Sequence, residues 1–73
     1  MTQDTQTIQI HVNGQDRETG AGLTVTDFLR SLDLRPELVV VERNRVILRK
    51  DDYSTVQIEA GDTLELVHFV GGG

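Results

Sequence analysis

The sequence predicts an α+β fold, in which a mixed sheet of four to five strands carries one main helix packed on one face. Three observations predict it. The chain begins with an alternating apolar segment before an Asn-Gly pair, continues with apolar residues at helical spacing, and then supplies several short β-type segments. Because one helix cannot cover both faces of a sheet, it packs on one face only.

A hairpin is predicted at the start of the chain. Apolar and polar residues alternate over residues 8–12, as in a half-buried strand. Asn13-Gly14 follows at once, and both residues tolerate the positive φ of a tight hairpin turn. A returning strand is therefore expected over residues 15–19, whereas the polar residues 1–6 are predicted to form a disordered N-terminal extension.

One helix follows the hairpin. Thr24 suits the N-cap position, and Asp27 three positions later can complete a start that resembles a capping box. The helix then carries one apolar stripe, made of Val25, Phe28, Leu29 and Leu32. Pro36 cannot continue a helix and disfavours helical geometry at Arg35, so the helix ends before this pair.

The second half of the chain is predicted to form three strands. Residues 38–41 are typical of a buried strand, and residues 46–48 are predicted to form another short strand after a polar turn at residues 42–44. Gly61-Asp62 marks a turn into the last strand, residues 63–70.

The first and last strands are the richest in apolar residues. We place them side by side and parallel in the centre of the sheet, joined through a right-handed helical crossover. This order of elements is that of the β-grasp, or ubiquitin-like, fold. The predicted domain spans residues 7–70, and residues 71–73 form a flexible C-terminal glycine tail.

Composition excludes several classes of function. The 73 residues include 12 Asp and Glu against 7 Lys and Arg, a net charge of −5, which argues against binding to nucleic acid. There is no cysteine, so thiolate metal sites are excluded, and no apolar run is long enough to span a membrane. So short a chain leaves little room for a deep substrate pocket, and its start lacks a secretory signal. We therefore expect a cytoplasmic protein that is not itself an enzyme and binds no cofactor.

The glycines Gly71, Gly72 and Gly73 are the strongest functional signal. They follow directly on an apolar strand, and glycine is a poor residue for continuing a strand. A glycine carboxylate has no side chain beside it, so a nucleotide phosphate or a nucleophile can approach it freely. The tail is therefore predicted to be the working part, which threads a narrow channel while the folded body stays outside.

The folded body needs a docking surface, because ordering three glycines is costly and they offer little apolar area in return. If Leu64 faces the core, alternation along the last strand turns three residues to the opposite face. These candidate partner-docking residues are Glu65, Val67 and Phe69. A bulge near His68 would instead return Phe69 to the core.

Several features follow one another in an order and at a spacing that are typical of a known family. They are Val12-Asn13-Gly14, the helix at 25–32, the segment 39–44, Arg49, Gly61-Asp62, Glu65 and the terminal Val70-Gly71-Gly72-Gly73. With them the chain resembles the ThiS family of sulfur carriers in thiamine biosynthesis, from Ile8 to Gly73. A terminal di-glycine also occurs in other ubiquitin-like carriers, so the order and spacing make the match specific.

The resemblance implies a mechanism. An E1-like adenylyltransferase of the ThiF type uses ATP and magnesium to convert the Gly73 carboxylate to an acyl-adenylate. Sulfur from a cysteine desulfurase then replaces the adenylate and gives a thiocarboxylate. The carrier next docks on a thiazole synthase of the ThiG type and delivers the sulfur. Gly73 is the modified residue, and Gly71 and Gly72 give access and reach.

Other readings stay open at this point. A carrier of the same fold could serve molybdopterin synthesis or tRNA thiolation, since these carriers end alike. A ubiquitin-like modifier joined to lysines through Gly73 and a plain interaction module with an inert tail are the alternatives of a different class.

Overall fold

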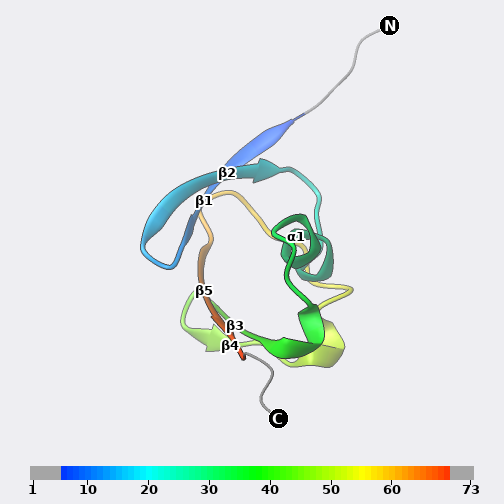
Figure 1. The fold of residues 1–73 in the computed structure, drawn as a ribbon. Helices are drawn as coiled ribbons and strands as arrows, with labels where there is room; N and C mark the ends of the chain where they lie inside the picture. Colours follow the sequence, from blue (N-terminus) through cyan, green and yellow to red (C-terminus); the bar gives the residue numbers. More distant parts are fainter. Residues whose placement is uncertain (1–5, 70–73) are drawn as a thin grey trace, which may run out of the picture.

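The first hairpin forms where the sequence predicts it, in a computed structural model that describes residues 6–69 (Figure 1). Strand β1, Thr7–Val12, pairs antiparallel with β2, Gln15–Gly20. Asn13 and Gly14 connect them with φ values of 50° and 82°, the left-handed geometry that an Asn-Gly hairpin turn needs. The predicted tail, residues 71–73, and all of the predicted extension except Gln6 lie outside the described residues.

Helix α1, Val25–Ser31, begins at the predicted cap. The hydroxyl Oγ1 of Thr24 accepts a hydrogen bond from the Asp27 amide at 3.1 Å, which satisfies one free donor of the first turn. The stripe packs as expected, because Val25, Phe28 and Leu29 are buried and Leu32 is partly buried against them. Beyond α1 the chain is extended at Arg35 and then forms a short 3₁₀ helix, η1, Pro36–Leu38.

The two strands after η1 differ from the predicted boundaries. Strand β3 is Val39–Arg43, so Leu38 belongs to η1, and the predicted turn at residues 42–44 is wrong in its first two positions. Glu42 and Arg43 remain in the sheet because they pair with β4, Val46–Ile47, and with the last strand. The turn consists of Asn44 and Arg45, both at positive φ.

The side chain of Tyr53 supports β3 through two hydrogen bonds to the backbone of that strand. After the 3₁₀ helix η2, Lys50–Asp52, the buried side chain of Tyr53 reaches back to β3. Its hydroxyl donates to the Val39 carbonyl at 2.8 Å and accepts from the Val41 amide at 3.1 Å. Burial raises the pKa of this phenol and outweighs the opposing hydrogen bond from Val41, so the group stays neutral and keeps its donor.

Strand β5, Thr63–His68, occupies the centre of the sheet, whose order is β2-β1-β5-β3-β4. It runs parallel to β1 and antiparallel to β3, which confirms the predicted central pair and the β-grasp arrangement. The strand ends at His68, two residues before the predicted boundary. Figure 1 shows the sheet curving around α1, which covers one face. The core between them consists of Ile10, Val25, Phe28, Leu29, Val39, Val41, Tyr53, Ile58 and Leu64.

Candidate functional site

Strand β5 leads directly to the predicted working end of the chain. Gly73, the predicted modification site, lies outside the described residues together with Gly71 and Gly72. The three candidate docking residues all lie within the described part, on β5 or immediately after it. The geometry of β5 therefore defines the part of the site that the folded body supplies.

The two faces of β5 differ sharply in burial. Leu64 is fully buried beneath α1, whereas Val67 and Phe69 are each 54% exposed. The pairing with β3 runs without interruption from Arg43–Leu64 to Val39–His68, so no bulge returns Phe69 to the core. The candidate docking residues thus lie on the sheet face opposite α1, which we call the outer face.

Neighbouring strands extend this outer face. Val40 lies directly opposite Val67, and Glu42 lies directly opposite Glu65. Ile47, which is 67% exposed, faces Glu42 from β4. Like charges placed opposite each other across two strands destabilise a sheet. Among residues 6–69 neither glutamate forms an ion pair, so the outer face combines exposed apolar side chains with two carboxylates that a basic partner would neutralise.

The side chain of Asn13 forms hydrogen bonds to the C-terminal half of β5. Its Oδ1 accepts from the Leu66 amide at 2.8 Å and its Nδ2 donates to the Leu66 carbonyl at 3.4 Å. The Asn13 amide also donates to the Leu64 carbonyl at 2.9 Å. The amide side chain therefore continues the ladder beyond the last residue of β1, alongside the half of β5 that carries the docking residues. The sequence indicates Asn13 only as a turn residue, because this role depends on a neighbour 53 positions away.

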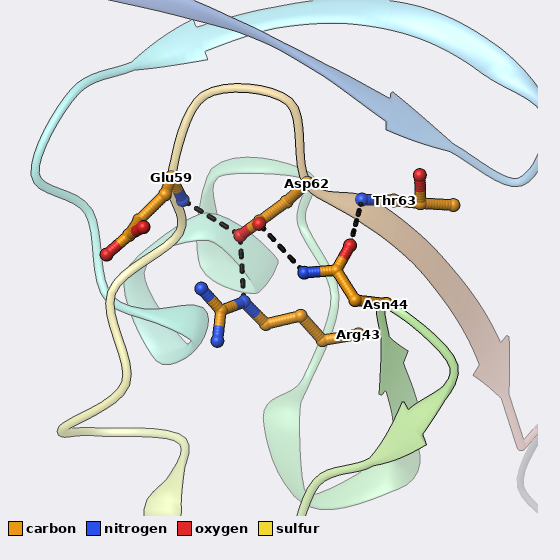
Figure 2. Close-up of polar contacts among 5 residues, drawn as sticks. All are labelled: Arg43, Asn44, Glu59, Asp62 and Thr63. Carbon is orange, nitrogen blue, oxygen red and sulfur yellow. Dashed lines mark hydrogen bonds and ion pairs between the residues drawn. The ribbon is translucent and has the colours of Figure 1, made fainter.

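A polar cluster holds the other end of β5 (Figure 2). The carboxylate of Asp62 accepts from Arg43 Nε at 2.8 Å, from Asn44 Nδ2 at 3.1 Å and from the Glu59 amide at 2.9 Å. The Asn44 Oδ1 in turn accepts from the Thr63 amide at 2.9 Å. The cluster joins the β3–β4 turn to the turn that precedes β5, and so it fixes where β5 begins.

Asp62 is charged in this setting. Its side chain is 7% exposed, and burial by itself raises the pKa of the carboxyl. The hydrogen bonds from Glu59, Arg43 and Asn44 and the charge of Arg43 outweigh that effect, and the pKa falls below its ordinary value of 3.8. The ion pair between Asp62 and Arg43 is therefore part of the folded structure, and the arginine side chain is only 24% exposed.

Arg49 and the two histidines are not among the candidate docking residues of the outer face. Arg49 is an exposed residue, 3.7 Å from Asp51 across a solvated ion pair. The His11 ring contacts Asp16 at 2.6 Å on the surface, and His68 is exposed at the end of β5. Within residues 6–69 no group of three or more His, Cys, Asp or Glu side chains could hold a metal ion. In the same residues no helix combines the length and apolarity that a bilayer crossing needs.

A pocket of about 350 Å³ opens on the helix side of the sheet. This volume is larger than we expected, because so short a chain leaves little room for a pocket. It lies beyond the end of α1, where Leu32 and Leu34 line it together with Val12 and Leu66 of the sheet. Arg17 and His68 also line the pocket, whereas the candidate docking residues do not.

Comparison with known proteins gives one consistent result. The model of the ThiS family matches residues 10–73. The sulfur carrier protein ThiS of Bacillus subtilis is 41% identical over 68 residues, which cover 88% of this chain and 98% of that protein. A crystal structure of the thiamine biosynthesis protein ThiS from Geobacter metallireducens superposes with a TM-score of 0.73 at 33% identity, covering 90% of this chain and all of that one.

A second kind of relative is much longer. The thiazole synthase of Magnetococcus marinus is 39% identical over 66 residues, and that of Paramagnetospirillum magneticum is equally similar. The match covers 90% of this chain but only 20% of each thiazole synthase. A segment similar to this chain thus occurs inside polypeptides that bear that enzyme's name.

Proposed function

The chain belongs to the ThiS family, the sulfur carriers of thiamine biosynthesis, and from this premise we propose that its Gly73 carboxylate is the group that carries the sulfur. The observation that carries the proposal is the position of β5. This strand is anchored in the centre of the sheet and leads straight from an exposed apolar surface into residues 70–73. The folded body therefore provides the surface that partner proteins bind, and the chain end provides the reacting group.

The chemistry proceeds in two steps at the Gly73 carbonyl. An adenylyltransferase of the ThiF type, with ATP and magnesium, joins the Gly73 carboxylate to the α-phosphate of ATP and releases pyrophosphate. Hydrosulfide, which a thiol reductant releases from the persulfide of a cysteine desulfurase, then attacks the acyl carbon. The new C–S bond replaces the C–O bond to phosphate, and AMP leaves. Glycine suits both steps because it places no side chain beside the carbonyl.

The partner that accepts the sulfur is a thiazole synthase of the ThiG type. Support comes from the two thiazole synthases that contain a segment similar to this chain, since such an arrangement keeps a carrier close to the enzyme it serves. Because the activation step consumes ATP, we place the reaction in the cytoplasm. In this proposal the chain itself binds no cofactor.

A mass measurement tests the proposal. The full chain is incubated with the adenylyltransferase of the same organism, ATP, magnesium and a sulfur source, and its intact mass is recorded. The expected result is a gain equal to the exchange of one oxygen atom for one sulfur atom, located in the C-terminal peptide. Conjugates of higher mass would favour a protein modifier instead, and an unchanged mass with an active adenylyltransferase would contradict the proposal.

Truncation of Phe69 is expected to weaken docking to the thiazole synthase. Phe69→Ala should raise the dissociation constant about tenfold, because an exposed aromatic side chain that becomes buried on binding contributes strongly to the binding energy. The fold should be preserved, since Phe69 is not part of the core. Titration calorimetry with the purified synthase measures the effect.

Val46→Ala is the matched control for this prediction. Val46 is 61% exposed, comparable to Phe69, but it pairs with Arg43, whose side chain points to the Asp62 side of the sheet. This variant should bind the synthase within about twofold of the unmodified chain. Equal loss in both variants would show that the outer face has no special role.

A further inference from the structure

The turn between β3 and β4 contains a residue that backbone geometry disfavours. Seven residues between 6 and 69 have positive φ, and six of them are Gly, Asn or Asp, which tolerate this geometry. The exception is Arg45, with φ of 72°. A long side chain with a Cβ is strained in this region, so a reason for arginine must lie outside the backbone.

The chain itself supplies the comparison. Its two hairpin turns have nearly the same φ values, 50° and 82° at Asn13-Gly14 against 51° and 72° at Asn44-Arg45. The first turn uses glycine at its second position, as this turn type prefers, and the second turn uses arginine. Asn44 is explained by its bonds to Asp62 and Thr63, but those bonds place no demand on the residue that follows.

Contacts within the fold do not explain Arg45 either. The side chain is exposed, and it takes part in none of the ion pairs or side-chain hydrogen bonds formed among residues 6–69. Two positions further along the chain, Ile47 is 67% exposed on the outer face. We define Arg45 and Ile47 together as the hairpin tip: a cation and an exposed apolar side chain in one short hairpin, in a chain whose net charge is −5.

The hairpin tip lies at the far end of the outer face from the chain end. Arg43 pairs with Leu64 at the start of β5, and Val39 pairs with His68 at its finish, so four residue steps, about 13 Å, separate the two ends. An ordinary protein interface covers about 800 Å² per partner, which is wide enough to include both. From the chain end to the hairpin tip, the chain then carries an apolar, an acidic and a basic group in a fixed order: Phe69, Glu65 and Arg45.

We propose that the hairpin tip is a second docking point for the thiazole synthase, at which Arg45 pairs with a carboxylate on the synthase surface. The inference rests on the proposed function and adds to it a residue that fixes the orientation of the carrier. The cation at one end and the two glutamates in the middle of the outer face allow only one direction of docking, which keeps the chain end aimed at the reacting centre. Glycine at position 45 would stabilise the turn and lose this contact.

Three substitutions separate the charge of Arg45 from its backbone geometry. Arg45→Gln keeps the disfavoured φ and removes the charge, Arg45→Lys keeps both, and Arg45→Gly removes both. Arg45→Gln should weaken binding to the thiazole synthase about threefold to tenfold at low salt, with no change in Tm, and the difference should disappear near 0.5 M salt. Arg45→Lys should bind within about twofold of the unmodified chain.

Arg45→Gly should bind as weakly as Arg45→Gln but melt higher, by about 4 °C. The matched control is Gly14→Arg in the other hairpin, which should lower Tm by about as much, since a Cβ at Gly14 meets no other atom and only the φ of 82° opposes it. Binding of Arg45→Gln equal to that of the unmodified chain at low salt would overturn the inference. An unchanged or lower Tm in Arg45→Gly would also overturn it.

The Phe69→Ala variant, titrated in the same series, distinguishes this inference from the proposed function. Weaker binding by Phe69→Ala together with normal binding by Arg45→Gln would remove the hairpin tip and leave the proposed docking face in place. If the unmodified chain failed to bind the synthase at all, the proposed partner would be wrong and the inference would fall with it.

Discussion

Removal of Gly73 is expected to lower the rate of adenylation and thiocarboxylate formation about a hundredfold or more. The shortened chain still ends in a glycine carboxylate, but that carboxylate lies one residue, about 3.5 Å, short of the nucleotide. Misplacement of a reacting group by even 1 Å can cost about a hundredfold in rate. The measurement is the intact mass of the chain over time with the adenylyltransferase, ATP and a sulfur source.

The fold should survive this deletion, because among residues 6–69 the last residue of the buried core is Leu64 and the last one packed against it is Leu66. An unchanged Tm for the shortened chain would therefore show that only the reacting group has moved. Gly71→Ala is the matched control, since it alters the tail without changing its length, and it should retain most of the rate. Full activity of the shortened chain would refute the assignment of Gly73 as the modified residue.

Replacement of Asp62 by alanine is expected to lower the free energy of unfolding by about 2–4 kcal/mol. The change removes the shared acceptor of Arg43, Asn44 and the Glu59 amide, and it leaves a partly buried guanidinium without a partner. For a domain of this size the loss is a large part of the total stability. Urea denaturation followed by circular dichroism measures it.

Asp51→Ala is the control, because Asp51 forms an ion pair that is almost fully solvated and should contribute less than about 0.5 kcal/mol. Equal stability of Asp62→Ala and Asp51→Ala would show that the cluster does not hold the start of β5.

The stability that the Asp62 carboxylate supplies should decrease at acid pH. The folded state lowers the pKa of Asp62 below 3.8, so the stability it supplies is complete above the ordinary pKa and is lost as pH falls through the lowered value. The advantage of the natural chain over Asp62→Asn should therefore be constant from about pH 7 to pH 5 and shrink below about pH 4. A difference that persisted undiminished at pH 2 would contradict the charged state assigned to Asp62.

The sequence predicts the local elements of this fold well, because the signals are local. Alternation over residues 8–12, the Asn13-Gly14 pair and the cap at Thr24 each act within a few positions, and the structure confirms all three. The boundary of β3 is less predictable. Glu42 and Arg43 are polar, which suggests a turn, but their backbone groups are paired on both sides and Arg43 is drawn to Asp62 19 positions away.

The candidate site divides in the same way. Alternation along β5 predicts that Val67 and Phe69 face away from the core, and the structure places them so. The sequence does not predict the roles of Asn13, Asp62 and Arg45, because each role depends on a distant partner or on a backbone angle. One signal could have pointed to Arg45: an Asn-Arg pair stands between two strands where this chain elsewhere uses Asn-Gly.

The central place of β5 has a mechanical consequence. An enzyme that draws residues 70–73 into its channel pulls along the axis of a strand that is flanked by β1 and β3. The interstrand hydrogen bonds lie across that direction, so the load falls on several of them in shear and they cannot open one after another as at a frayed edge. A pull on the chain end is thus opposed by several hydrogen bonds at once.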